Sequence, residues 1–146
     1  MTTRQTQPTA SVSLLLWDGE RVFLVRRDGT RGLFPHAWTL PGNPLQADET
    51  AKSGAGRICR DALGVAAERV VAVRELGEPS PFRQERGPDT LMRVVAWAGE
   101  PVARLANWER GEWFSIEEMA KLRILREGRE LISGECERIQ QAESRR

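Results

Sequence analysis

The stretch Leu40–Val65, LPGNPLQADETAKSGAGRICRDALGV, decides how the rest of the chain is interpreted. A short apolar run ends in Pro41 and Gly42, a polar segment follows, and an alanine-rich segment ends at Gly64, a residue typical of helix C-termini. The pattern predicts a strand, a loop and a helix in succession. Such a unit can hold its loop and one helix face against a phosphate or a metal ion.

The chain has the length of one domain and an almost balanced charge. Its 146 residues include 22 Lys and Arg and 21 Asp and Glu. A chain of this length buries roughly two-thirds of its unfolded surface without needing a staple. Because no sign of charge dominates, binding of nucleic acid or anionic lipid through bulk charge is not expected. We expect a disordered tail over residues 1–10 and a single domain over residues 11–142.

The cysteines and the hydropathy pattern indicate where the protein works. Cys59 and Cys136 are the only cysteines and form no Cys-x-x-Cys pattern, so both are expected in the core and no zinc site is indicated. No apolar run approaches the ~20 residues that a membrane-spanning helix needs, and the N-terminus has no apolar signal region. We therefore expect a cytoplasmic protein that makes no contact with a membrane.

The segments around the opening stretch predict a mixed α/β fold. Apolar and β-branched runs predict strands at residues 11–17, 21–26, 38–40, 68–77, 90–99 and 112–114. The turn Asp18-Gly19-Glu20 predicts that the first two strands pair as an antiparallel hairpin. Ser115 and Glu118 predict a capping box at the start of a helix, and apolar spacing predicts a further helix from about Leu122 to Gln140. The polar segment 78–89 is either a loop bordering a site or a loose connector.

Residues 43–65 resemble the Nudix box of the Nudix (MutT-like) hydrolases, Gly-x5-Glu-x7-Arg-Glu-U-x-Glu-Glu-x-Gly-U, in which U is apolar. The spacing is kept throughout: Asn43 takes the first Gly position, Glu49 the first Glu and Arg57 the Arg, and Gly64 stands near the end. The order of the flanking elements also resembles the family over residues 11–140. The resemblance implies a Nudix-like α/β/α sandwich, with a mixed β-sheet flanked by helices. It also implies substrates made of a nucleoside diphosphate linked to another group.

The side chains of the box depart from the family's pattern at its metal-binding positions. Three glutamates hold divalent cations in the family, and their positions fall here on Ile58, Asp61 and Ala62. Positions n, n+3 and n+4 share one helix face, which lets three carboxylates converge on a hard cation. The resemblance therefore leaves Glu49, Arg57 and Asp61 as catalytic candidates, and Asp61 and Glu49 as ligands of Mg²⁺ or Mn²⁺. Loss of the other ligands predicts weak or absent hydrolysis, in which case no cofactor is needed.

The same helix also has a purely structural interpretation. An apolar stripe at helical spacing indicates a core or an interface and leaves a homodimer open; its members are Ala51, Ala55, Ile58, Cys59 and Ala62. Arg57 and Asp61 would then form a surface ion pair, with Glu49 a polar residue at the helix entrance. Gly54 and Gly56, costly inside a helix, indicate either close packing or relaxed selection on a catalytic helix.

Candidates for ligand binding lie outside the box. Arg26 is a candidate to reach phosphates, and Trp38 and Phe82 are candidates to stack on a base, with ordinary exposure or core packing as the alternatives. The leading hypothesis is a degenerate Nudix domain that binds a nucleotide-like small molecule or a protein partner. The alternative is an active hydrolase that uses Glu49, Asp61 and a relocated acid from Glu85, Asp89, Glu109 or Glu112. A DNA-recognising domain, like those of some DNA glycosylases, gains no support from the net charge, so nucleic acid is not expected as a partner.

Overall fold

A computed structural model describes residues 10–27, 36–66, 69–79, 88–95, 97, 99–104, 108–124 and 126–144. Residues 1–9 of the expected tail and residues 80–87, which include Phe82 and Glu85, lie outside these ranges. Along the chain the elements are β1 (Ser11–Leu15), β2 (Arg21–Arg27), β3 (Trp38–Thr39), β4 (Gly42–Pro44), α1 (Ala51–Asp61), β5 (Arg69–Pro79), β6 (Pro88–Val95), β7 (Trp108–Ser115), α2 (Ile116–Met119) and α3 (Arg126–Ser144).

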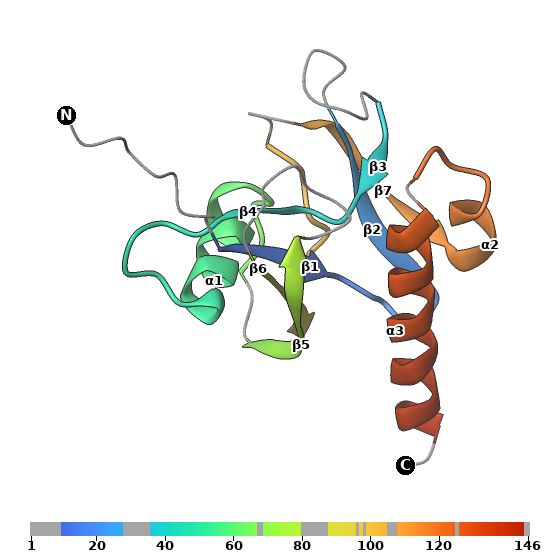
Figure 1. Ribbon diagram of the computed structural model, residues 1–146. Coiled ribbons are helices and arrows are strands. Elements are labelled where there is room, and N and C mark those ends of the chain that lie inside the picture. Colours follow the sequence, from blue (N-terminus) through green and yellow to red (C-terminus); the bar gives the residue numbers. More distant parts are fainter. Residues whose placement is uncertain are drawn as a thin grey trace.

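The strands form two sheets. One has the order β4-β1-β6-β5 and is mixed, because β1 runs parallel to β6 and the other neighbours are antiparallel. The other has the order β3-β2-β7 and is antiparallel throughout. In Figure 1, α1 lies beside the mixed sheet on the left, and α2 and α3 lie beside the antiparallel sheet on the opposite side of the molecule, on the right. The expected fold class, mixed β-structure flanked by helices, is confirmed.

The predicted hairpin between the first two strands is wrong in its pairing. The turn itself forms, with the N–H of Asp18 donating to the carbonyl of Arg21 over 3.1 Å. Beyond it an isolated bridge joins Trp17 to Val22, and the N–H of Phe23 donates to the carbonyl of Leu16 over 3.0 Å. The pairing then stops, because β1 and β2 enter different sheets. Every residue of β1 is buried. A strand that is buried on both faces lies in the interior of a fold, and β1 accordingly pairs with β4 on one side and β6 on the other.

Two hydrophobic clusters lie on either side of the first strands. Leu14 and Leu16 belong to the cluster under α1, whereas Leu15 and Trp17 belong to the cluster under α3. This division follows from the alternation of side chains along an extended chain. The layers α1, sheets and α3 are therefore held together by residues that alternate within one segment.

The helices begin and end for local reasons, and the last helix differs from its prediction at both ends, since it extends to Ser144 instead of Gln140. Gly64 adopts a φ of 64° just beyond α1, as expected for a helix terminator. The capping box of α2 is confirmed, with the N–H of Ser115 donating to Glu118 Oε1 over 2.9 Å. The last helix starts at Arg126 instead of near Leu122, because tight turns follow α2 and the N–H of Leu122 donates to the carbonyl of Met119 over 3.1 Å. Within the described part of the chain, no helix has the length and apolar character needed to cross a bilayer.

Candidate functional site

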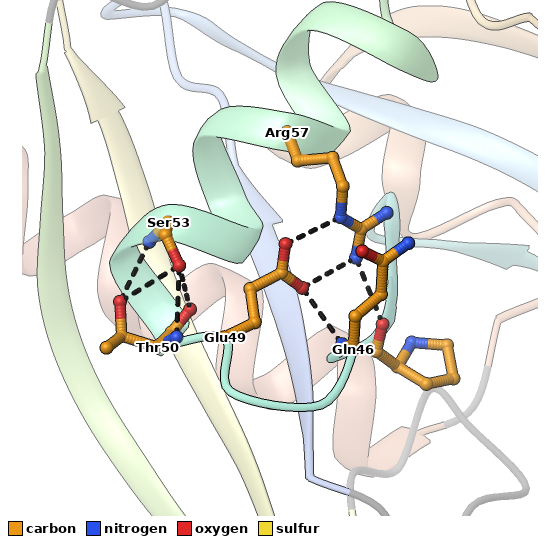
Figure 2. A network of polar contacts seen from close by, with 6 residues as sticks. Gln46, Glu49, Thr50, Ser53 and Arg57 are labelled. Carbon is orange, nitrogen blue, oxygen red and sulfur yellow. Dashed lines mark hydrogen bonds and ion pairs between the residues drawn. The ribbon is translucent and has the colours of Figure 1, made fainter.

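The loop before α1 is tied to the helix by a charged pair from the box. Arg57 Nε donates to Glu49 Oε2 over 2.7 Å, and Arg57 Nη2 donates to Glu49 Oε1 over 2.9 Å (Figure 2). The same carboxylate accepts the backbone N–H of Gln46 over 2.9 Å, and Arg57 Nη2 also reaches the carbonyl of Pro44 over 3.3 Å. Both oxygens of Glu49 are thus engaged in a two-pronged ion pair that fixes the turn of the loop.

This pairing sets the charge state of both groups. The hydrogen bonds from Arg57, and then from the backbone of Gln46, lower the pKa of Glu49 to about 2. The hydrogen bond to Glu49 raises the pKa of Arg57, and the charge of Asp61 adds a smaller effect in the same direction. Glu49 is therefore a firmly ionised carboxylate whose two oxygens both accept hydrogen bonds. It is unsuited to act as a general base near neutral pH.

The start of α1 also explains one of the two helical glycines. A Cβ on Gly54 would overlap Cδ2 of Leu45 and lie 3.2 Å from Glu49 Oε1. Thr50 caps the helix through a capping box with Ser53, so the chain turns sharply from loop to helix at this point (Figure 2). This box lacks the usual sequence pattern, because a serine, not a glutamate or glutamine, occupies its third helical position. Gly54 is thus explained by close packing of the loop, one of the two alternatives left open by the sequence.

The apolar stripe of α1 faces the interior of this chain. Ala55, Ile58 and Cys59 are fully buried in the cluster under the helix, and Ala51 and Ala62 pack against it. Burial raises the pKa of the Cys59 thiol to about 11, which keeps it protonated and unreactive. The stripe therefore gives no reason to expect a subunit interface, and the homodimer stays a prediction.

The residues present do not fit a divalent cation held as the family box would hold it. At two of the three carboxylate positions, Ile58 is enclosed by the core and Ala62 packs on it. The third, Asp61, is exposed at the end of α1. Among the described residues there is no group of three or more His, Cys, Asp or Glu side chains able to surround a metal ion. Metal ligation by Asp61 and Glu49 stays a prediction, and for Glu49 it would require breaking the pair with Arg57.

The ligand-binding candidates outside the box lie apart from α1 in the fold. Arg26 Nε lies 3.1 Å from Glu109 Oε2, and His36 Nδ1 lies 2.9 Å from Glu109 Oε1. Trp38 is buried in the cluster under α3, where it meets the edge of Phe114 at a ring-centroid distance of 4.8 Å. The side chains of Arg26 and Trp38 are therefore engaged within the protein, and a role for either in binding substrate stays a prediction. Phe82 lies outside the described residues.

The acids proposed as replacement ligands do not gather beside α1 in the described structure. Glu109 pairs with Arg26 and His36 as above. Glu112 lies 3.9 Å from Arg110 on the exposed face of β7, one of the strands of the other sheet. Glu85 lies outside the described ranges, and of Asp89 only the backbone is described, which pairs with Ser11 and Leu76. The described residues thus lend no support to a relocated metal site.

Comparison with known proteins places this geometry in a family. A MutT NUDIX hydrolase from Burkholderia pseudomallei is 20% identical over 87% of this chain and 97% of its own, with a TM-score of 0.71. The NUDIX domain of Shewanella oneidensis NrtR, in complex with ADP ribose, is 17% identical over 92% of this chain and 90% of its own, with a TM-score of 0.74. A bifunctional NMN adenylyltransferase/ADP ribose pyrophosphatase from Francisella tularensis, complexed with AMP and an Mn ion, is 18% identical; the match covers 92% of this chain and 43% of that one, with a TM-score of 0.64.

At these identities the structural similarity speaks for the fold alone. No curated protein shows significant sequence similarity to the chain. The family model for the NUDIX domain, however, matches residues 7–133, which is most of the sequence. The chain therefore belongs to the NUDIX domain family.

Proposed function

We propose that this NUDIX domain binds a nucleotide-like small molecule and hydrolyses it weakly or not at all. The observation that carries the proposal is the complete burial of Ile58, at a box position where the family pattern has a metal-holding glutamate. An isoleucine supplies no oxygen, and its enclosure leaves no space beside it for a hydrated cation. The departure from the family pattern is thus built into the core.

The remaining members of the box support the same conclusion. Glu49 is ionised and fully engaged by Arg57 and the backbone of Gln46, so its role is to hold the loop against the helix. Asp61 alone keeps an exposed carboxylate on α1. In the family the cations offset the charge that develops on the phosphates, and a single carboxylate is a poor replacement for three. The box of this chain therefore retains the ion pair of Glu49 and Arg57, which holds the loop on the helix, and lacks most of the carboxylates that bind metal in the family.

The ligand class is inferred from relatives with the same fold. The Shewanella domain is described in complex with ADP ribose, and the Francisella enzyme with AMP and an Mn ion. Both ligands carry an adenosine joined to phosphate. ADP ribose and AMP are thus the first ligands to test, with and without Mg²⁺ or Mn²⁺.

A second candidate function rests on Asp61. Its exposed position on the box helix would let it hold a largely hydrated Mg²⁺ together with the phosphates of a substrate. In that case the chain is a slow hydrolase whose activity depends on this one residue. The two candidates differ in what removal of the Asp61 charge does.

Calorimetric titration with ADP ribose, and chromatographic measurement of the AMP and ribose 5-phosphate formed from it with Mg²⁺ or Mn²⁺, test both candidates in the wild type and in Asp61→Asn. Glu137→Gln, which neutralises an exposed acid on α3, is the matched control. We expect saturable binding, hydrolysis at the background rate, and no change in either variant. Rapid metal-dependent hydrolysis that Asp61→Asn abolishes and Glu137→Gln preserves would establish the second candidate. Absence of binding to every nucleotide tested would overturn the ligand proposal.

A further inference from the structure

A groove runs along the outer face of α1, on the side away from its buried stripe. Its volume is about 490 Å³, and it lies between the helix and the start of β5. The residues that matter for its chemistry are Lys52, Ser53, Gly56 and Arg60 of α1 and Arg69 of β5. None of them belongs to the Glu49 and Arg57 pair or to the metal-binding positions of the box.

The charge in this groove is of one sign. Lys52, Arg60 and Arg69 are exposed and line it together, and none of the described residues that line it carries a carboxylate. Within the described part of the chain, no acid forms an ion pair with any of the three. The chain as a whole is nearly neutral, with 22 basic and 21 acidic residues, so three unpaired cations in one groove are a local concentration of charge.

Two residues of the groove oppose the stability of the helix that carries them. Lys52 is in the first turn of α1, which has no acidic residue, so its charge faces the positive end of the helix dipole. Gly56 is inside the helix, where glycine is unfavourable relative to alanine. Unlike Gly54, it is not required by packing: a Cβ there would meet only Arg60 Nη1, at an ordinary 3.6 Å. Residues that break local rules without a structural gain are expected at functional sites.

The positions of these residues form a continuous basic track. Lys52, Gly56 and Arg60 are spaced four apart, so they follow one another along the same side of α1 over a rise of about 12 Å. The glycine between the two cations leaves the backbone as the floor of the groove. Arg69 approaches from β5 across the groove. Lys and Arg bind phosphate oxygens through charge-assisted hydrogen bonds, and a row of cations matches a row of phosphates.

We propose that this groove binds a chain of two or more phosphates, either free or as the phosphate chain of a nucleotide. Lys52 and Arg60 hold successive phosphates from the helix, and Arg69 holds them from the strand. The absence of a side chain at Gly56 lets the ligand lie against the helix between the two cations. This site is separate from the binding proposed above and does not depend on any hydrolytic activity.

The proposal is tested by titrating the full chain with tripolyphosphate and following the backbone amide signals of α1 and β5 by NMR. Lys52→Gln combined with Arg60→Gln is expected to weaken binding by at least about tenfold, since two charge-assisted contacts are removed. Lys121→Gln combined with Arg123→Gln is the matched control, because it removes the same charge from exposed positions after α2 and is expected to leave binding unchanged.

Three results would overturn the proposal. The first is the lack of saturable tripolyphosphate binding, and the second is equal weakening by the control, which would show attraction by net charge alone. The third is a change of amide signals, on addition of tripolyphosphate or of ATP as a second arm, that leaves the signals of α1 and β5 unaffected, because it would place the phosphates elsewhere. Equal loss of ATP and tripolyphosphate binding in the groove variant supports recognition of the phosphate chain itself. Thermal unfolding of each variant confirms that it is folded, and removal of Lys52 is expected not to lower stability.

Discussion

Restoring the missing glutamate at position 58 should strongly destabilise the folded protein, because that position lies in the core. Ile58 is fully buried, and full burial of such a side chain contributes about 1.5–3 kcal/mol. Ile58→Glu loses that contribution and also places an unpaired carboxylate in the core, at a cost of several kcal/mol. We expect a loss of about 5 kcal/mol at pH 7.5, out of the roughly 5–15 kcal/mol typical of a small domain.

Ile58→Gln is the matched control, because glutamine has the same shape as glutamate but carries no charge. The neutral amide still loses apolar burial and leaves its own polar atoms without partners, at about 1–3 kcal/mol. A carboxyl forced into the core has a pKa above its unfolded value, so the folded variant binds the proton more tightly. Its stability therefore rises as the pH falls through that pKa towards about 4.3, and the gap between the Glu and Gln variants narrows.

Urea unfolding followed by tryptophan fluorescence measures these differences, since the chain has five tryptophans. Profiles at pH 7.5 and pH 5 for the wild type and both variants give the gap and its pH dependence. A variant Ile58→Glu as stable as the wild type at pH 7.5 would refute the reasoning. It would show that position 58 can accommodate a charged group. The burial of Ile58 could then no longer support the proposed loss of hydrolysis.

Three further predictions concern the glycines of α1, the Glu49 carboxylate, and Gly111 of β7, where an added Cβ would overlap the ring of Phe23. Gly56→Ala should raise the free energy of unfolding by about 0.5–1 kcal/mol through helix propensity. Gly54→Ala should lower it by about 1–3 kcal/mol, because its methyl group overlaps Leu45. Equal stability of the two variants in chemical unfolding would contradict the assigned packing. Glu49→Gln should be less stable than the wild type at neutral pH, and the difference in stability should vanish as the pH falls from 4.5 to about 2. The reason is that the lowered pKa of Glu49 stabilises the fold only while the carboxylate is ionised. A difference between the two proteins that stays constant over this pH range in acid unfolding would rule this out. Gly111→Ala should cost about 1–3 kcal/mol because its methyl group would run into the buried ring of Phe23, and the cost should shrink in a Phe23→Leu background, as a double-mutant cycle of thermal unfolding can check.

The sequence predicted the unit around α1 well because its signals are local. Gly64 was expected to end the helix, and the apolar spacing from Ala51 to Ala62 was expected to form a buried or interfacial stripe. Both depend on backbone conformation and periodicity within a few residues. The engagement of Glu49 with Arg57 was not expected as a pair, because their separation of eight residues along the chain becomes proximity only once the loop has turned.

Features that depend on distant partners were harder to predict. The segment before the Asp18 turn was assigned to a hairpin, yet β1 pairs with β6, which is far away in the sequence, and no local pattern encodes that choice. The start of α3 was placed too early because Leu122 is apolar and packs on the cluster under that helix without being helical itself. The basic groove was also missed, since Arg69 comes from a strand and meets α1 only in the fold.

The alternation of β1 side chains between two clusters has a consequence for how the sequence can diverge. Leu14 and Leu16 belong to one cluster and Leu15 and Trp17 to the other, so β1 and the two residues that follow it lie between two separately packed interiors. A substitution beneath α3 has few contacts in common with one beneath α1, and the free-energy changes of such distant pairs are nearly additive. Substitutions in one cluster can then be accepted independently of those in the other. The cluster that holds Ile58 can therefore keep an isoleucine where the family pattern has a glutamate without any compensating change under α3.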